Sequence, residues 1–283
     1  IIFSLGPLAV RWYGLMYVFG FAGAYLLATR RAPRYGLTAE NVSDLIFYSV
    51  LGVIVGGRIG YVFVYGLEEL TQDPLYLFQV WKGGMSFHGG LVGCMLGIAW
   101  AAKKWGKRWF ELADFYVVQA PIGLFFGRMG NFINGELYGR ATADSNSWYG
   151  MVFPHIGDGV ARHPSMLYEA LLEGVALLLV MLWFTRKPRP LMATSGMFLA
   201  GYGVFRTMVE FARQPDYQMG NQGFLYGTDW LTTGMVLSSP MWIAGLTLIA
   251  FAYSKHRNGP FSPLVAADNK ANKPAGKSKK RSA

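Results

Sequence analysis

The stretch Gly127–Arg140 combines residue types that rarely occur together in a hydrophobic sequence. It follows an apolar run and contains two arginines, two asparagines, a glutamate and four glycines. Arg128 and Asn131 are three residues apart, so they would share one face of a helix. Guanidinium and amide groups donate hydrogen bonds to anionic oxygens, and glycines would let backbone N–H groups approach a ligand closely. The segment therefore predicts an anion-binding site.

A structural role is the alternative for the same residues. Arg128 would then cap a helix end by binding carbonyl groups, while Glu136 neutralises its charge. The density of polar groups in one Gly-rich segment favours the binding role, because ionisable groups near a hydrocarbon layer usually mark a substrate or ion path.

A second polar site is predicted around His88. Two Gly-Gly pairs, at positions 83–84 and 89–90, flank this histidine at the expected start of a membrane helix. A helix N-terminus offers free N–H groups and a partial positive potential, which favours the neutral form of a nearby histidine. Neutral imidazole accepts a proton. A hydrogen-bonded, purely structural histidine is the alternative.

A polar stripe is predicted on the sixth apolar run. Tyr202, Arg206, Glu210 and Arg213 recur at spacings of four, four and three residues, which places them on one helix face. The pair Arg206–Glu210 also fits a simple internal salt bridge. A stripe of this length is untenable against lipid, so it should face the protein interior.

Further polar side chains interrupt the other apolar runs. Arg58 lies between glycines and should make a structural ion pair, since an unpaired charge is costly in a bilayer. Glu169 and Glu173 are four residues apart, and we expect one of them to meet an intramembrane arginine. Tyr13 and Tyr17 share a helix face, where one of them could hydrogen-bond a ligand.

The elements that must position these residues are membrane helices. The chain is 53% hydrophobic and only 15% charged, against roughly 25% charged in an average soluble domain. Seven apolar runs approach or exceed the ~20 residues that cross a bilayer. The runs are Val10–Thr29, Leu45–Tyr65, Leu91–Ala102, Phe115–Met129, Leu167–Phe184, Met197–Phe211 and Met241–Tyr253. We therefore predict an all-α polytopic membrane protein with about seven spans and a small outward-facing loop region, the third and fourth spans giving the weakest signals.

The basic residues predict an orientation for these spans. Eighteen lysines and arginines fall in the connections after the odd-numbered runs and in the tail, against four in the opposite connections. By the positive-inside rule the N-terminus faces outward and the C-terminus is cytoplasmic. The net charge of +10 thus reflects topology and contact with anionic membrane lipids, and we expect no nucleic-acid partner. We predict a membrane domain over residues 1–257 and a disordered basic tail over 258–283.

Several other kinds of chemistry lack residues to support them. The single cysteine, Cys94, lies in the third run and excludes an intrachain disulfide. The sequence shows no metal-ligand cluster, Walker loop or nucleophile elbow, so we expect neither metal nor cofactor. The chain begins at Ile1, and we expect its natural start to lie upstream, with no cleavable signal peptide.

Three classes of function remain for a site of this kind. They are a lipid-modifying transferase, a membrane transporter, and a binding protein for an anionic lipid or solute. Arginine pairs bind phosphate through bidentate hydrogen bonds, which favours an anionic phospholipid as the ligand. Transporters usually contain repeats with broken helices at the midplane, and we recognise no such repeat in this sequence.

Six sequence blocks stand in an order that can be compared with known families. The most specific is Gly-Arg-x-Gly-Asn-Phe-Ile-Asn-x-Glu-x-x-Gly over residues 127–139. The others are Arg-Trp-Tyr-Gly-Leu-Met-Tyr (11–17), Gly-Gly-Arg-Ile-Gly-Tyr (56–61), Gly-Gly-Met-Ser-Phe-His-Gly-Gly (83–90), Arg-His-Pro-Ser-x-Leu-Tyr-Glu (162–169) and Tyr-Gly-x-Phe-Arg-x-x-Val-Glu-Phe-x-Arg-Gln-Pro-Asp (202–216). Together they resemble the bacterial prolipoprotein diacylglyceryl transferases. The blocks cover the chain to about Tyr253, and Met235 departs from the glutamine that the family often has.

The resemblance implies an enzyme of the bacterial inner membrane with seven spans and a periplasm-facing site. Its reaction would transfer the diacylglyceryl group of phosphatidylglycerol to the lipobox cysteine of a prolipoprotein signal peptide. A thioether would form and glycerol phosphate would be released, as the first step of lipoprotein biosynthesis. The thiol belongs to the protein substrate, which fits the absence of a nucleophile among the motifs of this chain.

The resemblance also implies roles for individual residues. Arg128 and Arg206 would clamp the phosphate, and His88 and Tyr13 would lie near the reacting carbon. The remaining substrate-binding positions are Asn131, Glu136, Gly139 and Glu210, with a supporting polar network of Arg58, Tyr202 and Glu169. The acceptor of the thiol proton stays open: His88 is the first choice, with Tyr13 or an arginine-bound hydroxide as alternatives.

Overall fold

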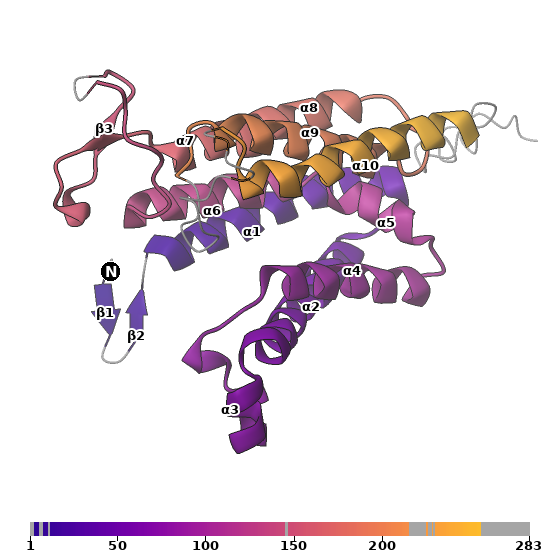
Figure 1. Cartoon of the computed structure of the whole chain (residues 1–283). Helices are drawn as coiled ribbons and strands as arrows, with labels where there is room; N and C mark the ends of the chain where they lie inside the picture. Colours follow the sequence, from indigo (N-terminus) through magenta and orange to yellow (C-terminus); the bar gives the residue numbers. More distant parts are fainter. Residues whose placement is uncertain are drawn as a thin grey trace, which may run out of the picture. The chain divides into compact units, whose positions relative to one another are not determined.

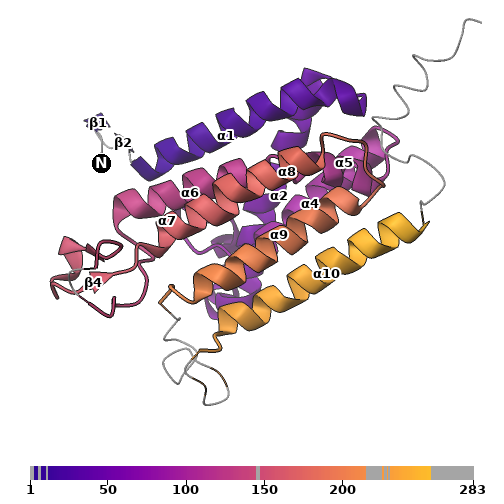
Figure 2. The ribbon, with the colours of Figure 1, turned by 90° about the horizontal axis from the view of Figure 1, so that it is seen from above.

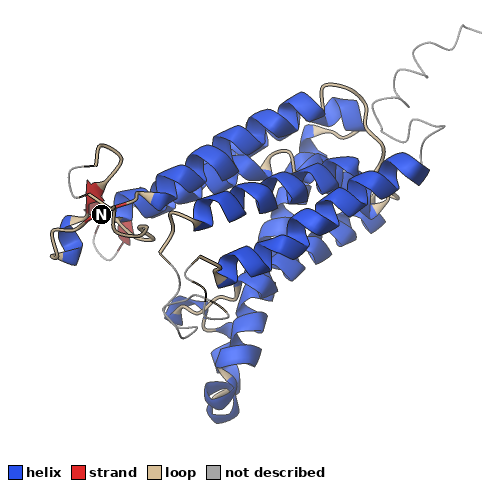
Figure 3. Ribbon diagram, turned by 45° about the horizontal axis from the view of Figure 1, so that its top comes forward, coloured by secondary structure: helices blue, strands red, loops and turns tan. Residues whose placement is uncertain are grey.

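The computed structural model describes residues 3–5, 8–10, 12–144, 147–214, 225, 228 and 230–255. Apart from short strand pairs and loops, the described chain is helical (Figure 3). It divides into two compact units, one formed by Ile1–Ala28 with Asp114–Ala283 and the other by Thr29–Ala113.

The first unit is built of long helices that lie side by side (Figures 1 and 2). The order across this layer is α1 (Trp12–Arg31), α6 (Ala120–Asn134), a composite rod, α9 (Ala193–Glu210) and α10 (Thr233–Lys255). The rod joins α7 (Ser165–Glu169), the π-helical segment η5 (Ala170–Ala176) and α8 (Leu177–Phe184) end to end. The motif helix α6 and the stripe helix α9 both pack against η5, which brings the two polar sequence blocks together.

Asp114 fixes the start of α9. It lies in α5 (Trp109–Tyr116), and its carboxylate accepts hydrogen bonds from the backbone N–H groups of Met192 and Ser195, both at 2.8 Å, and from the Ser195 hydroxyl at 2.6 Å. A carboxylate at a helix N-terminus satisfies free donors and complements the helix dipole. This cap anchors the helix that carries Arg206.

The second unit is a hairpin of two long helices, α2 (Ala39–Tyr65) and α4 (Phe87–Lys104), drawn in purple in Figure 1. The chain enters it through η1 (Ala32–Tyr35), and α3 (Leu67–Gln72), η2 (Pro74–Phe78) and η3 (Val80–Lys82) connect the two helices. Glycines line the contact, and a Cβ atom added at Gly93 would lie only 1.9 Å from the Gly52 carbonyl oxygen. Small residues therefore let the two backbones touch.

Among the described residues, strands occur only as short antiparallel pairs in the first unit. The pair β1 (Phe3–Leu5) and β2 (Leu8–Val10) precedes α1. Between α6 and α7, β3 (Met151–Val152) pairs with β4 (Ala161–Arg162), near the short helix η4 (Pro154–Ile156). Isolated bridges join Gly139 to Arg213 and Ala141 to Arg162, so the end of the motif lies between two other backbone segments.

The predicted spans can be compared with these helices. Each of the seven runs corresponds to a helix or a helix series of the described chain. Four helical segments are long and apolar enough to cross a membrane on those grounds alone, namely Trp12–Tyr35, Ala39–Tyr65, Ser165–Phe184 and Thr233–Lys255. The fourth run is not one helix, because the chain turns at residues 117–119 before α6 begins at Ala120, with Pro121 in its first turn. The tail predicted over 258–283 lies outside the described residues.

Candidate active site

A buried ion-pair network of the first unit joins the motif helix to the stripe helix. Arg128 of α6 places Nε 2.5 Å from Oε2 of Glu169, and Arg206 of α9 places Nη1 2.7 Å from Oε1 of the same carboxylate. A second nitrogen of Arg206, Nη2, lies 2.6 Å from Glu210 Oε1. The expectation that Glu169 or Glu173 meets an intramembrane arginine is thus confirmed. The alternative helix-capping role of Arg128 is wrong, because its partners are side chains rather than helix-end carbonyls.

Two further ionisable residues complete this network. Glu173 lies 3.9 Å from Arg128 and 3.7 Å from Arg206, and Arg213 lies 3.9 Å from both Glu169 and Glu210. The carboxylates are almost fully buried, whereas the Arg128 side chain is 20% exposed. The accessible part of the network is therefore cationic, with the acids behind it. Guanidinium groups in this arrangement suit a ligand with anionic oxygens.

Asn131 and Glu136 support Arg128 from within the motif. Arg128 Nη1 donates to Asn131 Oδ1 at 3.4 Å, and Asn131 Nδ2 donates to Glu136 Oε1 at 2.9 Å. Asn134 adds a second amide donor to the same Glu136 oxygen at 3.3 Å. Arg128 and Asn131 therefore share one face of α6, as predicted from their i,i+3 spacing, and the structure adds that the amide orients the guanidinium.

The glycines of the motif pack the backbone instead of exposing it to a ligand. A Cβ at Gly130 would lie 2.8 Å from the Tyr13 ring, so Gly130 lets α1 approach α6. Gly135 ends α6 with a φ of 70°. The N–H groups of Gly135 and Gly139 donate to the carbonyls of Phe132 and His163. For Gly135 and Gly139 the prediction that backbone N–H groups approach a ligand is therefore wrong, because each of these N–H groups already donates to a backbone carbonyl.

Arg140 joins the end of the motif to the end of α9. Its Nε donates to the carbonyl of Arg213 at 2.9 Å and its Nη2 to the carbonyl of Glu210 at 3.2 Å. The backbone N–H of Arg140 donates to the carbonyl of Ala212, and the carbonyl of Arg140 accepts from the backbone N–H of His163. Burial lowers the pKa of Arg140, and the charge of Glu210 opposes this shift. Arg140 thereby satisfies carbonyls that a helix end leaves free.

The predicted tyrosines lie beside the network. The hydroxyls of Tyr13 and Tyr17 are 3.4 Å apart, and Tyr13 lies against α6 at Gly130. Tyr202 stacks on Phe198, with ring centroids 6.0 Å apart. The phenol of Tyr202 also interacts electrostatically with Arg206 and Glu173. The stripe on α9 therefore faces the interior, as predicted.

Arg58 of the second unit binds backbone carbonyls. Its guanidinium donates to the carbonyls of Tyr76 at 2.5 Å, Leu77 at 3.2 Å, Gly83 at 2.6 Å and Gly84 at 3.3 Å. The guanidinium also lies over the Tyr76 ring, 4.6 Å from its centroid. The expected ion pair is wrong for the part of the chain that the structure describes, because the loop after α2 supplies enough acceptors for the five N–H donors of arginine. Arg58 thus orders the loop that leads to His88.

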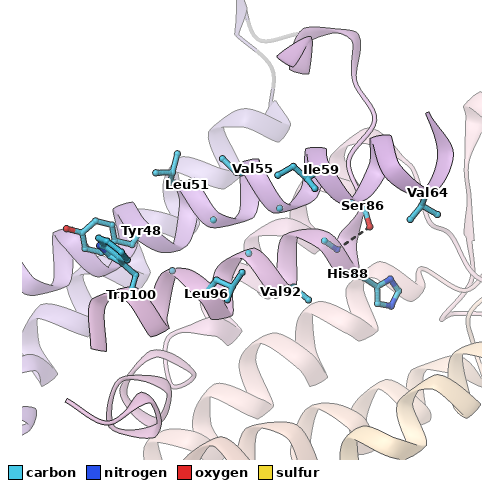
Figure 4. Close-up of a pocket in the computed structure, with 16 residues that line it drawn as sticks. Tyr48, Leu51, Val55, Ile59, Val64, Ser86, His88, Val92, Leu96 and Trp100 are labelled. Carbon is cyan, nitrogen blue, oxygen red and sulfur yellow. Dashed lines mark hydrogen bonds between the residues drawn. The ribbon is translucent and has the colours of Figure 1, made fainter. Parts of the chain in front are cut away.

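His88 lies in the first turn of α4, at the mouth of an apolar groove (Figure 4). The groove has a volume of about 760 Å³ and runs between α2 and α4, with Ser86 and His88 at one end and Tyr48 and Trp100 at the other. The Ser86 hydroxyl caps the helix by accepting from Gly89 N–H at 3.2 Å. His88 is exposed and contacts Phe87 edge to face. The groove suits aliphatic chains, whereas the arginine network suits an anion. His88 belongs to the second unit and the arginines to the first, so its place beside the reacting carbon stays a prediction.

Comparison with known proteins identifies the family. The family model for prolipoprotein diacylglyceryl transferase matches residues 1–251. The chain belongs to the prolipoprotein diacylglyceryl transferase family. Similar members include a phosphatidylglycerol–prolipoprotein diacylglyceryl transferase of Vibrio vulnificus, 54% identical over 257 residues that cover 90% of this chain and 92% of the relative. The enzyme of that name from Acinetobacter baumannii is 52% identical over 253 residues, covering 89% and 91%. The one from Aliivibrio salmonicida is 52% identical over 258 residues, covering 90% and 88%.

Several supporting residues of this diacylglyceryl transferase family member were not predicted from the sequence. Arg140 was identified as part of the motif but not as the cap of α9. The Ser165 hydroxyl donates to the carbonyl of Leu137 at 2.8 Å, which ties α7 to the motif, and Asp114 anchors α9 from a distant segment. These contacts depend on pairing between separate helices, for which a single sequence holds no local signal. The multi-pass membrane character predicted from composition agrees with the family.

Proposed function

We propose that this chain transfers the diacylglyceryl group of phosphatidylglycerol to the thiol of the lipobox cysteine of prolipoproteins, with Arg128 and Arg206 as the phosphate clamp. The observation that carries the assignment of the clamp is that these two arginines, from different helices, share the Glu169 carboxylate. Family membership over residues 1–251 supports the reaction itself, and it makes the chain a membrane transferase. A transporter or binding protein for an anionic lipid is the alternative class.

The carboxylates position the clamp and leave it donors for a substrate. A guanidinium has five N–H donors, and Glu169 and Glu210 occupy only part of those on Arg206. The remaining donors can bind phosphate oxygens in the bidentate manner that arginine favours. Asn131 and Glu136 orient Arg128, and Gly139 sets the backbone spacing at the edge of the site. The proposed phospholipid-binding residues are thus Arg128, Asn131, Glu136, Gly139, Arg206 and Glu210. Tyr202 belongs to the polar network that supports them.

The reaction is a displacement at a glycerol carbon. The substrate sulfur forms a bond to carbon, the carbon–oxygen bond breaks, and the phosphate leaves with the bonding electrons. Negative charge grows on the phosphate in the transition state, and fixed guanidinium groups in a site that excludes water stabilise it. The thiol, with an ordinary pKa of about 8.5, must lose its proton. His88 is the proposed acceptor, with Tyr13 or an arginine-bound hydroxide as alternatives.

The proposal includes a location and a domain. The chain resides in the bacterial inner membrane, with its N-terminus in the periplasm and its C-terminus in the cytoplasm. The distribution of lysine and arginine between the connections supports this orientation. Residues 1–257 form the transferase domain, and its basic cytoplasmic connections contact anionic lipid.

The reaction can be tested with purified components. The protein in detergent should release glycerol phosphate from phosphatidylglycerol only when a lipobox peptide is present. A peptide with serine in place of the cysteine is the control and should give no release, because an alcohol is a far poorer nucleophile than a thiolate. Movement of phosphatidylglycerol or glycerol phosphate across liposome membranes without peptide modification would instead support the transporter class.

A further inference from the structure

Glu173 is the least satisfied acid of the arginine network. It lies in the middle of the π-helical segment η5 and its side chain is 0% exposed. Neither of its carboxylate oxygens has a hydrogen-bond partner within the described residues. Its nearest guanidinium nitrogens are 3.7 Å and 3.9 Å away, on Arg206 and Arg128. A π-helical turn inside an α-helix costs stability and occurs often at functional sites.

The other acids of the network are held much more closely. Glu169 has guanidinium nitrogens at 2.5 Å and 2.7 Å, and Glu210 has one at 2.6 Å together with the Thr232 hydroxyl at 2.8 Å. Close cationic partners stabilise the charged form of a carboxylate. Protonation of Glu173 therefore costs less favourable electrostatic interaction than protonation of Glu169 or Glu210 would.

The network carries no net formal charge when all of its side chains are ionised. Arg128, Arg206 and Arg213 face three glutamates, and at the margins Glu136 and Arg140 add one charge of each sign. A phosphodiester brings one more negative charge into this buried site. An uncompensated charge in a low-dielectric interior is costly, and such sites usually respond by a change of protonation.

We propose that binding of the phosphate of phosphatidylglycerol to Arg128 and Arg206 is coupled to the uptake of one proton by Glu173. This inference rests on the proposed function of the same site. The proton comes from solvent and bonds to a Glu173 oxygen, and no other covalent bond changes in this step. One fewer carboxylate then attracts the two guanidinium groups, so they interact more strongly with the phosphate. When the product phosphate departs, Glu173 returns the proton.

The groups around Glu173 make it the acceptor of this proton. From the packed neighbours it faces Arg128 of α6, Glu169 of α7, and Tyr202 and Arg206 of α9, with the charge of Arg213 just beyond α9. The α8 segment, Leu-Leu-Leu-Val-Met-Leu-Trp-Phe, contributes no titratable side chain. Glu169 is a like charge that disfavours an ionised Glu173, and an incoming phosphate adds a second one.

Calorimetry measures the coupling directly. Short-chain phosphatidylglycerol is titrated into the full-length protein in detergent, at one pH, in buffers of different ionisation enthalpy. The dependence of the heat on the buffer gives the number of protons taken up, which should be close to one for the wild type. Affinity should fall by up to about tenfold per pH unit as the pH rises through the linked range.

Variants assign the proton to Glu173. Glu173→Gln carries a neutral side chain of the same shape, so it should bind without proton uptake, and its affinity should not change with pH. Glu173→Asp keeps a titratable group and should keep the uptake. Glu111→Gln is the matched control, since Glu111 pairs with the exposed Arg108 and belongs to the other unit. It should behave as the wild type.

The outcomes separate this inference from the proposed function. Binding without proton uptake in the wild type overturns the inference and leaves the transferase assignment intact. Uptake that persists in Glu173→Gln also overturns it, because another group then takes the proton. Failure of the wild type both to bind phosphatidylglycerol and to modify the lipobox peptide overturns the proposed function instead.

Discussion

Arg128 and Arg206 are held together by one carboxylate. Glu169 presents Oε2 to Arg128 at 2.5 Å and Oε1 to Arg206 at 2.7 Å, so the separation of the two guanidinium groups is set by the width of a single carboxylate. A phosphate that binds both arginines meets a pair already fixed in position. Preorganised charges of this kind avoid reorganisation during the reaction, which is the largest electrostatic source of catalysis.

Lysine in place of either arginine should therefore slow diacylglyceryl transfer. Arg128→Lys and Arg206→Lys keep the charge but lose the forked donors that bind Glu169 and phosphate together. We expect kcat/KM for diacylglyceryl transfer to fall by about tenfold or more in each variant. The matched control is Arg108→Lys, because Arg108 is exposed and pairs only weakly through Glu111. If Arg128→Lys is fully active, Arg128 contributes only its positive charge and does not bind phosphate through its forked donors.

Two glycines of the motif should respond in opposite ways to alanine. A Cβ at Gly139 would lie 2.3 Å from the Ala212 carbonyl oxygen and 2.8 Å from that of His163, so Gly139→Ala must separate backbone segments that flank the site. At Gly127 an added Cβ meets nothing within 4 Å. Gly127→Ala should stabilise α6 by up to about 1 kcal/mol. The unfolding temperature and the activity per folded molecule should both fall in Gly139→Ala and not in Gly127→Ala. Equal values in the two variants would contradict the packing role of Gly139.

The contrast between these glycines shows what the sequence could predict. The spacing of polar residues was enough to predict that Arg128 shares a helix face with Asn131 and that the α9 stripe faces the interior, whereas the pairing of Arg128 with Arg206 was implied by the family resemblance. Helix periodicity fixes such faces locally. The sequence did not distinguish Gly127 from Gly139, because the need for glycine depends on a backbone that lies far away along the chain. The same limit explains why Arg58 was assigned an ion pair rather than loop carbonyls.

His88 as the proton acceptor predicts a large loss of rate when the imidazole is removed. His88→Asn should lower the rate of diacylglyceryl transfer by roughly 10²-fold or more. Asparagine fits the first turn of α4, whose cap is the Ser86 hydroxyl and not the imidazole. If His88 is only structural, His88→Asn will keep most of the rate per folded molecule. The dependence of the rate on pH would then follow ionisation of the substrate thiol, near pH 8.5, in the wild type and in His88→Asn alike.

The orientation can be tested by labelling single cysteines in intact cells. On a Cys94→Ala background, Ala143→Cys should react with a membrane-impermeant thiol reagent, because this exposed position lies between the fourth and fifth predicted runs, in a connection expected to face outward. Lys103→Cys should be spared until the cells are lysed, since this exposed residue belongs to a predicted cytoplasmic connection. The reversed pattern would contradict both the orientation and a periplasmic site.

His163 should make the segment between α6 and α7 sensitive to acid. Burial lowers the pKa of His163, and the nearby charge of Arg140 lowers it further. The unfolded histidine takes up its proton at a pKa of about 6.5, and the folded one only at lower pH. Between these two values the unfolded segment binds more protons than the folded one, so its stability falls as the pH drops below about 6.5 and is fully retained above.

Hydrogen exchange of one backbone N–H group in this segment measures the effect. The Gly139 N–H is bonded to the His163 carbonyl at 2.7 Å and reports opening of the segment. Its protection, corrected for intrinsic exchange, should decrease from pH 7 to pH 5.5 in the wild type. In His163→Gln the group that titrates is gone, so the decrease should disappear even if the protection is lower throughout. An unchanged pH dependence in this variant would assign the effect to a group other than His163. The carboxylate of Asp158 is not that group, because hydrogen bonds from Val160 N–H and Arg162 lower its pKa, so its contribution is lost only well below pH 5.5.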